Sequence, residues 1–323
     1  MCRRSKGACM SRRKVRLFFC LLLVAVLGVH GLQRRQVIVA AAPMVFDQYA
    51  PPQTHSFYVP NAPAIIGWPS ATALFYAAGR PYPTDVPEAY FDPSFNLTML
   101  RLRSSIIASA KRHNRQAITK LTDDQFAVLI AAQLYFEYNS ALATRGSFGR
   151  AVTPVYQEAQ GVANSLGLGN FSVWPANLRP SVGLSLLNGE MPYVNSLNEP
   201  TNRPIPIVIF GSSLQERMQR YSDWQPSETE VAAEISDPFL AVEYLAANFE
   251  VASYRAEHDW VTVNWMTFVA WHNQGLVSPG HISNNGQLAN VLPTFERYIP
   301  GAMALIYTPP DFVPGIVRQP IAK

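Results

Sequence analysis

Cysteine is almost absent from this chain, because its three cysteines (Cys2, Cys9 and Cys20) all lie near the amino end. The rest of the sequence therefore has no thiol that could form a disulfide, attack a substrate or bind a metal. None of the six histidines forms H-E-x-x-H or another metal-ligand spacing. A G-x-S-x-G motif and a glycine-rich phosphate loop are also missing. These absences predict a protein with no metal site and no cofactor.

Acidic residues are missing from residues 1–35, which hold nine of the 26 arginines and lysines. The net charge of +4 therefore conceals a body, residues 36–323, with a net charge of −5. A mildly acidic body lacks the basic surface that nucleic acids require, so we expect no nucleic-acid partner. Charged residues make up only 15% of the chain and apolar residues 48%, which favours a packed globule over disorder.

The first 31 residues have the pattern of a secretory signal peptide. A basic segment, residues 1–16, precedes an apolar run of about a dozen residues from Leu17 to Gly28. That run is short for a membrane span. We expect export to the cell envelope or secretion; if the segment is not cleaved, residues 17–31 would serve as a membrane anchor.

The rest of the chain divides into three parts by composition. Residues 32–95 form an arm that is rich in proline and aromatic residues from 43 onward, and this arm is a candidate surface for a protein partner. Residues 96–300 carry helical patterns with no alternation of strands and helices, which predicts a mainly α-helical domain. Residues 301–323 form a tail that we expect to be irregular. The first helix of the domain carries an apolar stripe of Leu97, Leu100, Ile106 and Ile107.

One segment of the helical domain, residues 121–140, is apolar on every side. Only Gln133 is polar between Phe126 and Phe136, and a helix without a polar face must be buried all round. Thr122 and Gln125 have the spacing of a capping box at its start. Glu137 follows the apolar run directly. Desolvation there would favour the protonated carboxyl, which is the form that a general acid needs.

Three later segments complete a pattern in which each motif is weak alone. The first is N-L-R-P-S at 177–181, the second is Tyr244-Leu245 within a helical segment, and the third is H-N-Q-G at 272–275. A helix ending in Glu, a turn with a proline, a Y-L helix and an N-x-G ending occur in this order. Together with the helix before Glu137, this order resembles the lysozyme-like superfamily over about residues 120–285. Within it, the soluble lytic transglycosylases and goose-type lysozymes are the most similar.

The resemblance implies a lysozyme-like helical fold around a buried central helix, with Glu137 as the catalytic acid. It also implies an amino-sugar glycan as substrate, above all peptidoglycan of the cell wall. By position in the motifs and by their ability to stack on or bond a sugar, the expected substrate-binding residues are Tyr138, Trp174, Asn177, Tyr244, His272, Asn273 and Gln274. Four of them differ from the usual pattern: Tyr138 replaces Ser, Trp174 replaces Gly, Asn177 replaces Gln and His272 replaces Tyr.

Carboxylates are missing from the segment after Glu137, since no Asp or Glu occurs between Tyr138 and Gln157. Most glycosidases use two carboxylates, one as acid and one as base or nucleophile. The absence of a second carboxylate from this segment favours the lytic transglycosylase reaction, in which the same Glu donates and then accepts a proton. The alternatives are a muramidase that hydrolyses the glycan, and a catalytically inactive glycan-binding or structural envelope protein of the same fold.

Overall fold

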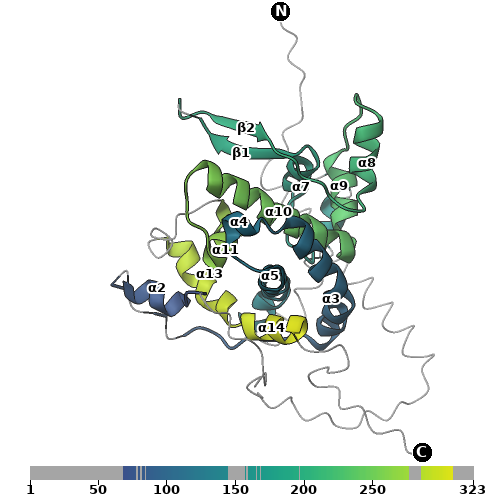
Figure 1. Cartoon of the computed structure of the whole chain (residues 1–323). Coiled ribbons are helices and arrows are strands. Elements are labelled where there is room, and N and C mark those ends of the chain that lie inside the picture. Colours follow the sequence, from purple (N-terminus) through teal and green to yellow (C-terminus); the bar gives the residue numbers. More distant parts are fainter. Residues whose placement is uncertain are drawn as a thin grey trace, which may run out of the picture.

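The computed structural model describes residues 68–307 except 78, 81, 84, 145–156, 158, 165, 168, 196 and 276–284. These residues form a mainly helical body with one two-stranded sheet (Figure 1). The elements of the first half are α2 (Ala71–Ala77), α3 (Pro93–His113), α4 (Gln116–Thr119), α5 (Asp123–Thr144), α7 (Pro180–Leu187), β1 (Glu190–Val194) and β2 (Pro200–Pro204). Those of the second half are α8 (Ser213–Arg220), α9 (Glu228–Ile235), α10 (Pro238–His258), α11 (Trp265–Gln274), α13 (Gly286–Glu296) and α14 (Ile299–Tyr307).

Helix α5 lies at the centre of the body, and the other long helices surround it (Figure 1). The predicted capping box is confirmed: Gln125 N donates to Thr122 Oγ1 at 3.2 Å, and Thr122 N donates to Gln125 Oε1 at 2.9 Å. Every residue from Phe126 to Leu134 has no exposed surface. The structure therefore confirms the predicted burial of this helix on all sides.

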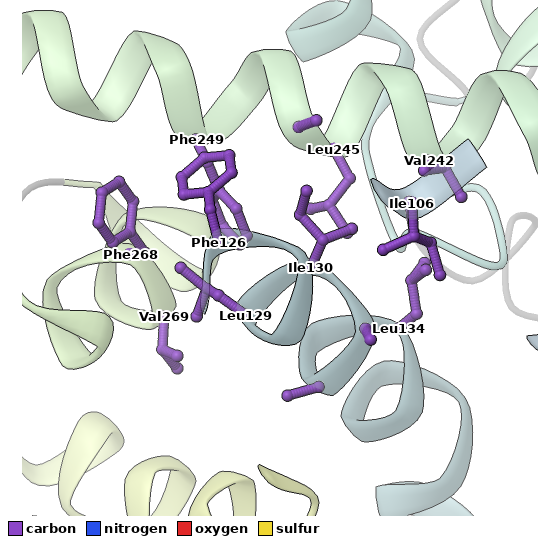
Figure 2. Close-up of a cluster of buried hydrophobic side chains, with 14 of the residues drawn as sticks. Ile106, Phe126, Leu129, Ile130, Leu134, Val242, Leu245, Phe249, Phe268 and Val269 are labelled. Atoms are coloured by element: carbon purple, nitrogen blue, oxygen red, sulfur yellow. The ribbon is translucent and has the colours of Figure 1, made fainter. Parts of the chain in front are cut away.

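Helix α10 crosses α5, and its apolar side chains pack on those of α5 at the crossing (Figure 2). Leu245 lies next to Ile130, and Phe249 meets the edge of Phe126 with ring centroids 6.1 Å apart. Phe268 of α11 closes the same aromatic group, 5.9 Å from Phe126. Large buried side chains such as these supply most of the free energy of folding. They fix the position of α5, and with it the position of Glu137.

Helix α14 packs along another side of α5, together with α3. The irregular tail predicted for 301–323 is therefore wrong as far as Tyr307, because these residues continue α14. Pro300 does not interrupt the helix, since it lies in the first turn, where a missing amide proton breaks no helical hydrogen bond. Arg103 of α3 donates to the carbonyl oxygens of Leu305 and Ile306, both at 2.8 Å, and so caps this last helix.

The part that precedes α3 is partly helical, because α2 occupies Ala71–Ala77 within the predicted arm. The signal peptide or anchor, the arm up to residue 67 and the tail beyond Tyr307 lie outside the described residues. Within the described part of the chain, no helix combines the length and the apolar character that crossing a membrane would require.

Candidate active site

Glu137 lies about two turns before the end of α5, and its side chain is 7% exposed. The neighbouring Asn139 holds this part of the helix in place. Its Nδ2 donates to the carbonyl oxygen of Tyr135, and its Oδ1 accepts the amide of Asp92 at 2.9 Å. Asp92 is the N-cap of α3, so the two helices are joined next to Glu137.

A turn at residues 173–178 brings Asn177 to the carboxyl group of Glu137. Val173 and Leu178 exchange two backbone hydrogen bonds at the base of the turn, of 2.7 and 3.2 Å. Asn177 lies at its end with φ of +54°, a left-handed conformation that asparagine adopts more readily than other non-glycine residues. Its Nδ2 donates to Oε2 of Glu137 at 2.6 Å.

His272 reaches the other oxygen of the same carboxyl from the last turn of α11. Its Nε2 lies 3.3 Å from Oε1 of Glu137, and its side chain is 2% exposed. The ring is turned so that neither nitrogen forms an aligned hydrogen bond with any described residue. The contact is therefore electrostatic, and it becomes an ion pair when the imidazole is protonated. The edge of Phe249 lies against the ring at a centroid distance of 6.4 Å.

Gln133 completes the surroundings of the carboxyl group from within α5 itself. It lies one turn before Glu137, has no exposed surface, and donates from Nε2 to Oε1 at 2.6 Å. The sequence contains the signal for this contact, because Gln133 is the single polar residue of the apolar run and stands four positions before Glu137. Gln133 is not among the site residues predicted from the sequence.

Two aromatic side chains flank this group. Tyr138 is half-buried and stacks on Phe95 of α3, with ring centroids 3.9 Å apart and planes 3° from parallel. Trp174, which precedes a cis peptide bond to Pro175, meets Tyr138 edge-on at 6.3 Å. Both rings retain some exposed surface, although Phe95 covers one face of Tyr138.

The other predicted substrate-binding residues lie apart from this group. Tyr244 is completely buried in α10 and donates from its hydroxyl to Glu234, so it has no surface to offer to a substrate. Burial, followed by this bond to Glu234, raises the pKa of Tyr244. Asn273 turns back on its own helix and donates to the carbonyl oxygen of Val269 at 2.9 Å, while Gln274 is exposed.

Unmet hydrogen-bonding capacity is concentrated around Glu137. Eight buried side-chain nitrogen or oxygen atoms have no hydrogen-bond partner among the residues described, and four of them belong to Gln133, Trp174 and His272. Buried polar atoms are normally satisfied, so a local group of unsatisfied ones indicates a place where water or a ligand binds. No group of His, Asp or Glu in the described ranges is placed to hold a metal ion.

Comparison of the chain with protein families, with curated proteins and with solved structures finds no match.

Proposed function

We propose that this protein is a glycosidase of the lytic transglycosylase type that cleaves peptidoglycan between its amino sugars, with Glu137 as both acid and base. One observation carries the proposal. Glu137, Asn177 and His272 come from three motifs selected by their sequence alone, and their polar atoms converge on one carboxyl group. Motifs that matched by chance would have no reason to meet in this way.

The surroundings of the carboxyl suit the first step of this reaction, in which Glu137 gives its proton to the glycosidic oxygen. The proton leaves a negative charge on the carboxyl, and donors already in place stabilise that charge without rearranging. Asn177 donates to one oxygen and Gln133 to the other, both at 2.6 Å. Hydrogen bonds to a charged acceptor are the strong ones.

Protonation lets the bond between the anomeric carbon and the glycosidic oxygen break, and the protonated oxygen departs with the leaving sugar. In the second step the carboxylate takes the proton of the 6-hydroxyl on the sugar that keeps the anomeric carbon, and the oxygen of that hydroxyl bonds to the anomeric carbon. The leaving sugar has already received the first proton, so Glu137 ends protonated as it began. The product carries a 1,6-anhydro ring, and no second carboxylate or activated water is required. Because the nucleophile belongs to the bound sugar, the reaction also gains from proximity.

A second candidate is a glycan-binding or structural envelope protein of the same fold that has no activity. The observation that favours it is the enclosure of Glu137, since both carboxyl oxygens already have partners and the side chain is only 7% exposed. An acid that works on a substrate must be reachable by the glycosidic oxygen, within about 3 Å.

A peptidoglycan zymogram of the purified protein separates these candidates. The proposal expects clearing by the wild type and none by Glu137→Gln, whose amide keeps the size of the side chain. The matched control is Glu234→Gln, a buried glutamate on α9 away from the site, which should still clear. Mass spectrometry should find anhydro ends; reducing ends would indicate a hydrolase. An inert wild type that still sediments with peptidoglycan supports the glycan-binding candidate.

A further inference from the structure

Gln133 is an unusual residue for its position in the protein. It lies in the middle of the central helix with no exposed surface, between Ala132 and Leu134, which are equally buried. An amide in such a place costs free energy unless both its donor and its acceptor are satisfied. A residue such as leucine or methionine would fill the same space without that cost.

The amide of Gln133 is only half satisfied. Nε2 donates to Oε1 of Glu137 at 2.6 Å, whereas no described residue donates to the Oε1 of Gln133 itself. An ionised carboxylate can only accept, so the nitrogen is the end of the amide that must face it. The contact with Glu137 is therefore the hydrogen bond for which this side chain is oriented.

The geometry points to Gln133 as a positioning residue, which holds Glu137 in its working orientation at the expense of the stability of the core. Its effect on catalysis rests on the proposed function, but its coupling to Glu137 does not. With Asn177 on Oε2 and Gln133 on Oε1, a donor is fixed at each oxygen and the carboxyl group cannot rotate freely. Such support is what keeps a catalytic group within the narrow range of productive geometry.

Thermal unfolding of a double-variant cycle tests the coupling without any assay of activity. Gln133→Met leaves Oε1 of Glu137 with the unaligned His272 contact, so its Tm should fall. Gln133→Met with Glu137→Met replaces the whole buried pair by apolar side chains, which often stabilises a core. We expect the Tm of the double variant to exceed that of the wild type by about 2–4 °C. If the fall in Tm of the double variant equals the sum of the falls in the two single variants, the proposal is overturned. Gln133 and Glu137 would then each stabilise the core independently.

The separate values of kcat and KM test the positioning role. Gln133 has no exposed surface, so it acts on the reaction through its hydrogen bond to Oε1 of Glu137 and not through the substrate. Gln133→Met should therefore lower kcat roughly tenfold and leave KM within about twofold. An unchanged kcat would contradict the proposal.

Leu129→Met is the matched control, one turn earlier on α5 and equally buried. It should change the Tm without lowering kcat. If the wild type proves inert on peptidoglycan, the proposed function fails, and the cycle of Tm values alone then decides whether Gln133 and Glu137 act as a pair.

Discussion

Asn177 donates from Nδ2 to Oε2 of Glu137 across 2.6 Å, although 40 positions separate the two residues in the chain. The backbone of Asn177 has φ of +54°, which accounts for asparagine at this place. A residue with a longer or branched side chain would be more strained in that conformation. The turn therefore delivers an amide to the carboxyl group by means of a backbone shape that few residues adopt.

Asn177→Gly should lower peptidoglycan cleavage about ten- to a hundredfold, because it removes one hydrogen bond to a charged acceptor. Glycine accepts a positive φ without strain, so the turn is kept and a fall in Tm reflects the lost hydrogen bond to Glu137. Turnover and Tm of the purified variant check both points. Asn170→Ala is the control in the same segment, since Asn170 bonds Ser181 and not Glu137. Equal losses of activity in the two variants would show that activity depends on the structure of this segment and not on the hydrogen bond from the Asn177 amide to Glu137.

His272→Phe keeps a ring of similar shape and removes the two nitrogens, neither of which has an aligned partner among the described residues. Removing unsatisfied buried atoms should leave the Tm unchanged or higher, whereas turnover should fall roughly tenfold with the loss of the contact to Oε1. Trp271→Phe is the control at the neighbouring position of α11, because it removes the hydrogen bond from Trp271 Nε1 to Asn248 of α10 and leaves His272 in place. If His272→Phe retains full turnover, the imidazole has no part in the reaction.

The buried His113 should make stability depend on pH. Burial lowers its pKa, but the hydrogen bonds and charges of Glu243 and Glu250 outweigh burial and raise the pKa overall. Its contribution to stability is therefore complete below the unfolded pKa of 6.5 and is lost as pH rises through the higher folded pKa. Burial raises the pKa of Glu243, but bonds from His113, Arg112 and Ser109 lower it to about 2, so its contribution is lost only in strong acid.

We therefore expect the free energy of unfolding to be highest between about pH 5 and pH 6 and to decline on the alkaline side. Thermal denaturation from pH 5 to pH 9 measures this decline. His113→Leu should lose roughly 3–5 kcal/mol, because it leaves buried carboxylates without their partner, and it should also lose the alkaline decline. His258→Leu, a partly exposed histidine paired with Asp259, serves as the control and should have a small effect. If the alkaline decline persists in His113→Leu, another titratable group causes it.

Gly183 allows α7 and α9 to approach closely. A Cβ atom there would lie 2.6 Å from carbon atoms of both Val231 and Ile235. Gly183→Ala should thus cost about 1–3 kcal/mol by overpacking, measured as a fall in urea midpoint. Gly161 is the opposite case, since it is exposed in helical residues 159–164 and a Cβ would meet nothing within 4 Å. Gly161→Ala should stabilise by about 0.5–1 kcal/mol; a loss at Gly161 comparable to that at Gly183 would contradict the packing argument.

Sequence reasoning predicted the elements whose signals are local. The capping box at Thr122 and the all-round burial of α5 follow from residue types at fixed spacing, and both are confirmed. The stripe of α3 was only partly right, because Leu97 is 48% exposed while Met99 and Leu102 are buried. Which side of α3 faces the core depends on its packing against α10 and α5, and the sequence of α3 alone does not specify that packing.

The candidate site shows the same division. Motif order selected Glu137, Asn177 and His272, whose polar atoms meet. It also selected Tyr244, which is buried beside Glu234 because its helix presents that face to α9. Gln133 carried a signal at i and i+4 that needed no tertiary knowledge. The sequence does not specify the direction of the Asn273 side chain, which the three-dimensional structure shows turned back toward Val269.

The packing of α14 against α5 has a consequence for synthesis. Helix α5 is complete by residue 144, but one of its sides stays uncovered until Ile299–Tyr307 has left the ribosome. Contacts so far apart in sequence form late, because the intervening chain must first be closed into a loop. A nascent chain that has not reached α14 therefore exposes apolar side chains of α5 that are buried in the folded protein. Exposed apolar surface of this kind promotes aggregation until the last described helix is made.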